Sequence, residues 1–193
     1  MGKRDRYHHG DLRRALLEEA TQRVEADGAE QLSLRACART LQVDPAAAYR
    51  HFKDKSAILG VVAATHHEAL VQMTVDAAAE GTGEERLLQL ITAYVEFAVH
   101  RTHLFRLVYG PHGPATDAPP LGITHALDAV YAERGVDPEE ALGPEADELA
   151  WAAIHGLATL AADGRIEHDP LTLQARAEAM CELILGGLEA LEG

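Results

Sequence analysis

Cysteine and long apolar runs are scarce in this chain of 193 residues. Its two cysteines, Cys37 and Cys181, lie far apart in the sequence, which indicates reduced thiols rather than a disulfide framework. A bridge between two copies of Cys181 across a symmetric dimer stays open. No apolar run reaches the roughly 18 residues of a membrane span, and the basic N-terminus lacks the apolar segment of a signal peptide. We therefore expect a cytoplasmic protein with no contact to membranes.

The chain also lacks the motifs of common enzymes. It contains no Gly-x-Ser-x-Gly, no phosphate-binding loop and no His-Glu-x-x-His sequence. Its histidines are scattered, and His100 and His103 have a spacing that would chelate a metal only if one helix ran through both. We predict that the protein is not an enzyme, uses no cofactor and has no metal site, its histidines being solvated surface residues.

Acidic residues outnumber basic ones, but the two signs are segregated along the chain. The formal net charge of the whole chain is −14. Residues 1–55 hold 11 Lys and Arg against nine Asp and Glu, a net charge of about +2, whereas the rest holds 6 against 22, about −16. The N-terminal part is therefore compatible with the phosphates of DNA, and the acidic part must contact something else.

Apolar residues recur at spacings of three and four almost throughout, and no stretch alternates with a period of two. This pattern predicts an all-α protein, and 47% hydrophobic residues suffice for a core. The one real break is segment 110–120, which holds four prolines and two glycines and is typical of a loop. We expect helices at about 11–26, 34–41, 45–51, 55–79, 84–100, 103–109, 121–134, 144–163 and 170–190.

Two short helices with a tight turn between them are expected within residues 33–55. Ser33 and Asp44 can each cap one of them, and Pro45 occupies a first helical position, where no backbone N–H is needed. The second helix has no acidic residue between Pro45 and Lys53. Two helices at this spacing, the second short and free of acids, are typical of a helix-turn-helix that enters the major groove of DNA.

The last two expected helices carry glycines and alanines on their apolar faces, which permits close helix approach. They can pack internally, or they can pair with their copies across a two-fold axis as a four-helix bundle. Because one short recognition helix seldom gives useful specificity alone, we expect a homodimer formed through about residues 144–190.

Three segments within the N-terminal 65 residues form a specific combination. They are Tyr7-His8-His9-Gly10-Asp11-Leu12-Arg13, Leu34-x-x-x-Ala38-x-x-Leu41-x-Val43 and Tyr49-Arg50-His51-Phe52-x-x-Lys55-x-x-Ile58-Leu59. Together they resemble the TetR family of one-component transcriptional regulators. Farther along, Trp151, His155 and Gly156 resemble a Trp…His-Gly signature in the regulatory region of one branch of that family.

The resemblance implies nine helices in two domains, one for DNA and one for a ligand. Residues 1–54 would form a three-helix DNA-binding domain with a basic arm, and residues 55–193 a six-helix ligand-binding and dimerisation domain. DNA contacts are expected from the arm residues Lys3, Arg4 and Arg6, from Ser33, from the recognition-helix residues Ala46, Ala47, Tyr49 and Arg50, and from His51 and Lys55 at phosphates.

The helix-turn-helix departs from the family pattern in ways that bear on readout. Gln42 stands where the turn usually has glycine, so this turn must accept a side chain. Alanines occupy much of the reading face, so bidentate hydrogen bonds to bases must come from Tyr49 or Arg50. We therefore expect a larger share of indirect readout, through the shape of the DNA.

Aromatic residues and histidines of the acidic part would line a mostly apolar pocket for a small-molecule effector. The candidates are Tyr94, Phe97, His100, Phe105, Tyr109, Trp151 and His155. In the alternative interpretation the aromatic residues are simply core, and Trp151 and His155, one helical turn apart, form a packed pair.

The resemblance implies a transcriptional repressor that a small-molecule effector releases from a palindromic operator, and the apolar character of the expected pocket favours a largely apolar effector. The alternative is a DNA-binding protein without a small effector, whose acidic domain binds a protein partner. A regulatory domain without an enclosed cavity would favour that alternative.

Overall fold

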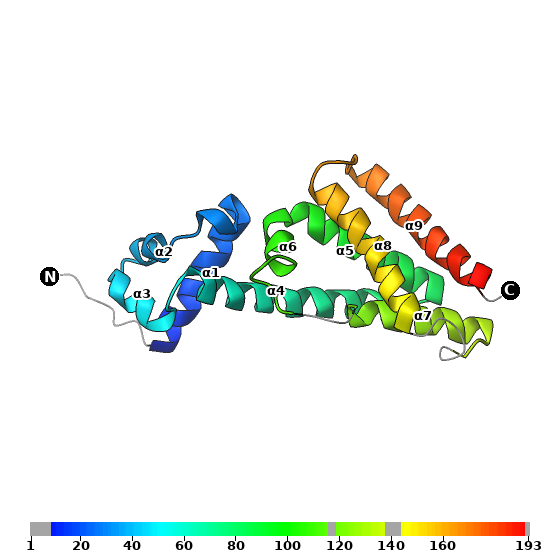
Figure 1. Ribbon diagram of the computed structural model, residues 1–193, viewed down its shortest axis with the longest axis horizontal. Coiled ribbons are helices and arrows are strands. Elements are labelled where there is room, and N and C mark those ends of the chain that lie inside the picture. Colours follow the sequence, from blue (N-terminus) through cyan, green and yellow to red (C-terminus); the bar gives the residue numbers. More distant parts are fainter. Residues whose placement is uncertain (1–8, 116–118, 138–143, 192–193) are drawn as a thin grey trace. The chain divides into compact units, whose positions relative to one another are not determined.

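The computed structural model describes residues 9–115, 119–137 and 144–191 (Figure 1). Within these ranges every regular element is a helix, which confirms the predicted all-α class. The elements are α1 (His9–Asp27), η1 (Ala29–Gln31), α2 (Leu34–Thr40), α3 (Pro45–His51), α4 (Lys55–Ala77), α5 (Gly83–His100), α6 (Thr102–Val108), α7 (Leu121–Arg134), α8 (Pro144–Ala162) and α9 (Pro170–Leu191). The short 3₁₀ helix η1 was not among the predicted elements.

Helices α2, α3 and α4 begin where the sequence supplies a capping side chain. The Ser33 hydroxyl accepts the N–H of Ala36 at 3.4 Å, and the Asp44 carboxylate accepts the N–H of Ala46 at 2.8 Å. The Asp54 carboxylate accepts the N–H of Ala57 at 2.8 Å in the same way. Each cap satisfies a backbone donor that the first helical turn leaves without an intrahelical partner.

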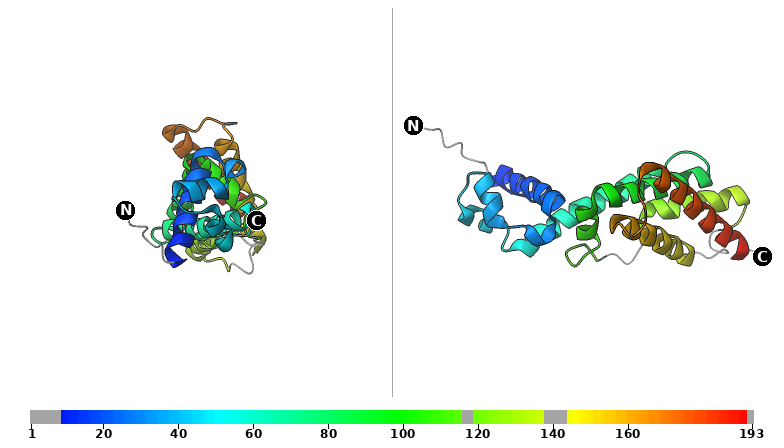
Figure 2. Two further views of the ribbon diagram at one scale, coloured as in Figure 1. Left: turned by 90° about the vertical axis from the view of Figure 1, so that its left-hand side faces the viewer. Right: turned by 90° about the horizontal axis from the view of Figure 1, so that it is seen from above.

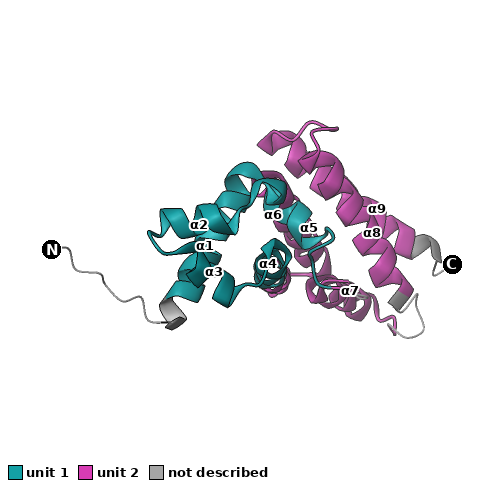
Figure 3. Cartoon of the chain, turned by 60° about the vertical axis from the view of Figure 1, so that its left-hand side comes forward, with its two compact units in different colours: residues 1–67, 103–114 teal, residues 68–102, 115–193 magenta. Residues whose placement is uncertain are grey.

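The chain divides into two compact units (Figure 3). Unit 1 comprises residues 1–67 and 103–114, and unit 2 comprises residues 68–102 and 115–193. The predicted domain boundary, between residues 54 and 55, separates the first three helices from the rest. The compact units add the first part of α4 and most of α6 to those helices.

Unit 1 is built on the inward faces of α1, α2, α3 and the start of α4. The fully buried side chains on these faces recur at helical spacing and include Leu16, Ala20, Val24, Cys37, Ala38, Ala48, Ile58 and Leu59. Burial of this set packs the two short helices of the helix-turn-helix against α1, because each apolar face removed from water stabilises the packed arrangement.

Unit 2 is centred on α5, against which α7, α8 and α9 pack (Figures 1 and 2). The buried face of α5 includes Leu87, Leu90, Ile91 and Tyr94. The first turn of α5 meets α7 closely, since a Cβ built on Gly83 would lie 2.4 Å from the backbone nitrogen of Val130. None of the described helices has the length and apolarity that crossing a membrane requires.

Candidate functional site

The turn between α2 and α3 is closed by backbone hydrogen bonds. The N–H of Gln42 donates to the carbonyl of Arg39 at 3.1 Å, and the N–H of Val43 donates to the carbonyl of Ala38 at 3.0 Å. Gln42 has φ 55°, the one positive φ among the described residues other than glycine. This confirms that the turn accepts a side chain at the position where glycine is usual, in a conformation that L-residues adopt at a cost.

Helix α3 presents one face to the core of unit 1 and the other to solvent. Tyr49 is 43% exposed, and Ala46 and Arg50 are also exposed. Ala47, which the resemblance placed among the DNA contacts, is only 9% exposed and packs inward with Ala48. The outward face is therefore formed by Ala46, Tyr49 and Arg50, so that its polar groups come from two side chains.

Two other predicted DNA contacts have structural partners within unit 1. The ammonium group of Lys55, at the start of α4, donates to the carbonyl of Glu30 in η1 at 2.6 Å. The hydroxyl of Ser33 is exposed and caps α2. His51 is half-buried at the end of α3. The arm residues Lys3, Arg4 and Arg6 lie outside the described residues.

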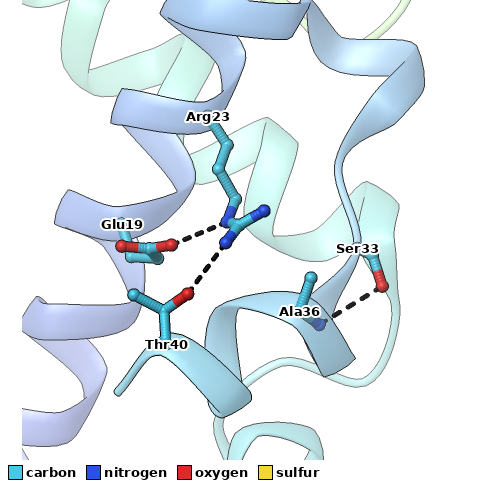
Figure 4. Close-up of polar contacts among 5 residues, drawn as sticks. All are labelled: Glu19, Arg23, Ser33, Ala36 and Thr40. Atoms are coloured by element: carbon cyan, nitrogen blue, oxygen red, sulfur yellow. Dashed lines mark hydrogen bonds and ion pairs between the residues drawn. The ribbon is translucent and has the colours of Figure 1, made fainter.

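Contacts of α1 with the helix-turn-helix were not anticipated from the sequence. The guanidinium group of Arg13 lies over the ring of Phe52, 5.2 Å from its centroid. Arg23 donates to the carboxylate of Glu19 at 2.6 Å and to the hydroxyl of Thr40 at 2.8 Å (Figure 4). The spacing of four between Glu19 and Arg23 was visible in the sequence, whereas Thr40 is brought near only by the fold.

In unit 2, three of the predicted effector residues lie together. The hydroxyl of Tyr94 on α5 is hydrogen-bonded to Nδ1 of His155 on α8 at 3.0 Å, and their ring centroids lie 6.3 Å apart. The centroid of the Trp151 ring lies 6.0 Å from that of His155. Burial lowers the pKa of His155, because a charged imidazolium is poorly solvated there. The cluster is thus aromatic, with a neutral histidine at its centre.

A carboxylate extends this cluster along the same face of α8, at the same spacing of four. Asp147 accepts a hydrogen bond from the hydroxyl of Thr124 on α7 at 2.5 Å. Burial raises the pKa of Asp147, while the bond from Thr124 opposes the rise and the nearby Asp128 adds to it. Asp147, Trp151 and His155 therefore form a mixed polar and aromatic stripe, of which Trp151 and His155 are predicted effector residues.

The other predicted effector residues do not join this cluster. Phe97 is half-buried with the guanidinium of Arg101 5.9 Å from its ring centroid, and His100 is exposed and donates from Nδ1 to the carbonyl of Glu96 at 2.9 Å. Phe105 and Tyr109 lie on α6 and its end, in unit 1, with ring centroids 5.1 Å apart. The seven predicted residues are therefore divided between the two units.

The condition for chelation by His100 and His103 is not met, because α5 ends at His100 and α6 begins at Thr102. Over the described part of the chain, no three side chains of His, Cys, Asp or Glu come together as metal ligands would. The cysteines are buried thiols, and the Sγ of Cys181 lies against α5, 3.7 Å from the carbonyl of Glu84.

A groove of about 190 Å³ runs between α8 and α9, and its lining is almost entirely apolar. The lining residues are Ala146, Leu149, Ala150, Ala153, Leu183, Ile184, Gly187 and Leu188. Leu149 and Leu183 are 62% and 66% exposed, which is unusual for large apolar side chains on adjacent helices. A Cβ built on Gly156 or Gly187 would meet no described atom within 4 Å, so these glycines leave the faces of both helices open.

Comparison with known proteins agrees with this arrangement. The family described as "Tetracyclin repressor-like, C-terminal domain" matches residues 87–184, about half of the chain. A solved protein of unknown function from Rhodococcus sp. RHA1 is 31% identical, with a TM-score of 0.73 over 95% of this chain and 98% of that one. No curated protein has a sequence that matches the chain.

Two solved relatives share the fold at lower identity. FadR from Bacillus subtilis, in complex with stearoyl-CoA, is 17% identical, with a TM-score of 0.63 over 90% of this chain and 98% of that one. A TetR variant from Acinetobacter baumannii AYE, in complex with minocycline, is 18% identical, with a TM-score of 0.60 over 92% and 96%. The family match reaches from the buried face of α5 into α9, and likeness to the Rhodococcus protein extends through the helix-turn-helix. The chain therefore belongs to the TetR family of transcriptional regulators.

Proposed function

We propose that this regulator is a repressor that binds a palindromic operator as a homodimer and leaves it when a small, largely apolar molecule occupies unit 2. The observation that carries the proposal is the exposure of Tyr49 and Arg50 on α3, a helix capped by Asp44 and held by a closed turn. A short helix with two exposed polar side chains suits insertion into a major groove.

The proposed dimer uses the groove between α8 and α9 as its contact face. Two copies of Leu149 and Leu183 would bury apolar surface that a monomer leaves in water. The chain has a negative net charge, so two copies repel each other where their acidic residues meet. An apolar contact face avoids bringing these like charges together. A palindromic operator follows from the two-fold symmetry of such a dimer.

The proposed effector site is the cluster of Tyr94, Trp151 and His155. Aromatic walls with a few polar groups are the usual composition of a small-molecule site, and a neutral His155 suits an uncharged or weakly polar group. The complexes of related folds with minocycline and stearoyl-CoA support a ligand with a large apolar part. Phe97 and His100 on α5 stay predicted contacts of such a ligand, whereas Phe105 and Tyr109 belong to unit 1 and are not part of this proposed site.

The test begins with DNA. Purified protein selects fragments from the genome of its source organism at moderate salt, and we expect recovery of a palindrome. Tyr49→Ala should then weaken binding to that palindrome by at least about tenfold, the discrimination that one base contact typically provides. Ala36→Ser, within the half-buried part of α2, is the matched control for a change in the helix-turn-helix outside its reading face.

The second stage adds candidate effectors. Compounds made or consumed by the products of the neighbouring genes are screened for release of the protein from its operator. Trp151→Ala should abolish the response without changing the affinity for the operator. A palindrome with no responsive compound, together with capture of one defined protein by unit 2, would replace the effector by a protein partner. Diffuse recovery that varies only with salt would contradict sequence-specific binding.

A further inference from the structure

Arg23 on α1 connects two groups that are far apart in the sequence (Figure 4). Its Nη2 donates to the hydroxyl of Thr40, the last residue of α2, at 2.8 Å. Its Nε donates to the carboxylate of Glu19, one turn earlier on α1, at 2.6 Å. Two different nitrogens of one guanidinium group are thus directed at two different partners.

Glu19 holds the guanidinium group of Arg23 in a defined direction. The side chain of Glu19 is 12% exposed and that of Arg23 is 32% exposed. The pair Arg14–Glu18, five residues earlier on the same helix at the same spacing, has side chains that are 71% and 57% exposed. An exposed ion pair contributes little to stability and samples many side-chain conformations. A partly buried pair is screened less by solvent, so it keeps its geometry. The guanidinium group of Arg23 therefore has a defined orientation when it donates to Thr40.

The contact with Arg23 matters because Thr40 lies at the C-terminal end of α2. Helix α2 has only seven residues, and its buried face is formed by Leu34, Cys37 and Ala38. Apolar burial has no preferred direction, so this short face leaves rotation of α2 against α1 weakly specified. A hydrogen bond is directional and fixes that rotation at the C-terminal end of α2.

The turn passes this orientation on to α3. The turn after Thr40 contains Gln42, whose N–H donates back to the carbonyl of Arg39, and Val43, whose N–H donates back to the carbonyl of Ala38. Both acceptors belong to the last part of α2, so the turn follows any rotation of that helix. The direction of α3 relative to α1 is set accordingly.

We propose that Arg23 is a positioning residue for DNA recognition. It holds the C-terminal end of α2 through Thr40, and so aims the exposed face of α3 at the major groove. This proposal rests on the proposed binding of DNA by α3, and it assigns Arg23 no contact with DNA. Because Thr40 is exposed, the hydrogen bond adds little to stability. Its effect is on the fraction of molecules in which α3 already has the orientation that DNA binding requires.

The experiment compares binding to the selected operator and to a random duplex over a range of salt concentrations. Arg23→Lys keeps the charge but loses the two-directional geometry, and Thr40→Val removes the hydroxyl. Each should weaken operator binding about fivefold, within the range that the loss of one hydrogen bond gives. Binding to random DNA and the slope of affinity against salt should not change. The double variant should be no weaker than either single variant.

Two controls separate the hydrogen bond from other effects. Thr40→Ser keeps a hydroxyl and should bind as the parent chain does. Arg14→Lys changes the exposed pair on the same helix and should also have no effect. If Arg23→Lys binds normally while Arg23→Ala flattens the salt slope by about one, Arg23 contacts phosphate and the proposal is wrong. If Thr40→Val alone weakens binding, Thr40 contacts DNA itself and the proposal is equally wrong.

A measurement without DNA tests the positioning role by itself. Hydrogen exchange of the backbone amides of Gln42 and Val43 should speed up in Arg23→Lys and Thr40→Val, and stay unchanged in Arg14→Lys. Unchanged exchange in all variants would overturn the positioning role. A parent chain with no preference for any operator would instead overturn the proposed function, while leaving the exchange result to decide on Arg23.

Discussion

The hydroxyl of Tyr94 lies 3.0 Å from Nδ1 of His155, and this hydrogen bond joins α5 to α8 inside unit 2. Tyr94 is fully buried, so its hydroxyl depends on partners within the protein. His155 is partly buried, and burial lowers its pKa, so the fold holds it in its neutral form. The hydrogen bond that joins the two helices therefore depends on the protonation state of His155, and so on pH.

The first prediction concerns the stability of unit 2 below neutral pH. The pKa of His155 is lower in the folded chain than its ordinary value of 6.5, so the unfolded chain takes up the proton first as pH falls. The stabilising effect of the neutral side chain is complete above pH 6.5 and is lost as pH falls through the folded pKa. We expect the urea midpoint to fall on acidification from pH 7.5, and less so in His155→Gln. His125→Gln, on the exposed face of α7, should keep the dependence of the parent chain.

The raised pKa of Asp147 does not produce the same dependence of stability on pH. A carboxyl group whose folded pKa lies above 3.8 contributes stability below that pH and loses it as pH rises, which is the opposite slope. An acid-side loss that His155→Gln leaves intact would show that another group is responsible.

The second prediction concerns Gly28, which lies between α1 and η1. Its backbone has φ 83° and ψ 163°, a region that only glycine occupies readily. A Cβ there would also lie 3.1 Å from Nδ1 of His103. Gly28→Ala should lower the free energy of unfolding by about 2–3 kcal/mol, the upper part of the range of such backbone strain. Urea unfolding measures the loss.

Gly164→Ala is the matched control for Gly28→Ala. Gly164 has φ 64°, and a Cβ there meets no described atom within 4 Å. This variant should lose only about 1 kcal/mol, the lower end of the cost of a left-handed residue. Equal losses at both positions would mean that neither the special ψ of Gly28 nor the contact with His103 matters.

The third prediction concerns the strain at Gln42 in the turn of the helix-turn-helix. A glycine there would remove the cost of φ 55°, but it would also make the unfolded chain more flexible. We expect Gln42→Gly to stabilise the protein by about 0.5 kcal/mol, and the β-branched Gln42→Val to destabilise it by about 1 kcal/mol. Gln42→Ala keeps the strain and should leave the urea midpoint unchanged, since the Gln42 side chain is exposed. A midpoint that is the same in all three variants would contradict the strain.

The features that the sequence predicted correctly are those that depend on neighbours along the chain. Caps at Ser33 and Asp44 act within three residues, so their residue types suffice to place the helix starts. The turn at Gln42 was predicted for the same reason. The proximity of Trp151 and His155 follows from their spacing on one helix.

Features that arise from packing between helices were not predictable in this way. Ala47 faces the core because α1 and α2 cover that side of α3, and nothing in residues 45–51 alone fixes which alanine turns inward. Arg23 meets Thr40 across 17 residues of sequence, and Tyr94 meets His155 across 61. Aromatic composition likewise grouped Phe105 with Tyr94, although the compact units separate them.

The fourth prediction concerns the reactivity of Cys181. Burial, together with the charges of Glu84 and Glu182, raises the pKa of its thiol to about 11. At pH 7.5 the thiolate that attacks alkylating reagents is therefore scarce, and the side chain is only 3% exposed. We expect iodoacetamide to label Cys181 slowly in the native protein and rapidly in urea, as mass spectrometry would detect. The same burial predicts no disulfide between two copies, so a covalent dimer on a non-reducing gel would contradict it.

The last prediction concerns the apolar groove between α8 and α9. If a second copy covers this groove, a charge placed on its rim must be buried next to the same charge of its symmetry mate. Loss of hydration and repulsion between the two like charges then both weaken the dimer. Leu183→Glu should therefore give a monomer by light scattering at micromolar concentration. Leu121→Glu is the control, because Leu121 is 57% exposed on α7, outside the groove. The Leu183→Glu monomer should also bind a half-site and the full palindrome with nearly equal affinity, since only the dimer engages both halves at once. A Leu183→Glu variant that stays dimeric would place the dimer contact elsewhere on the chain.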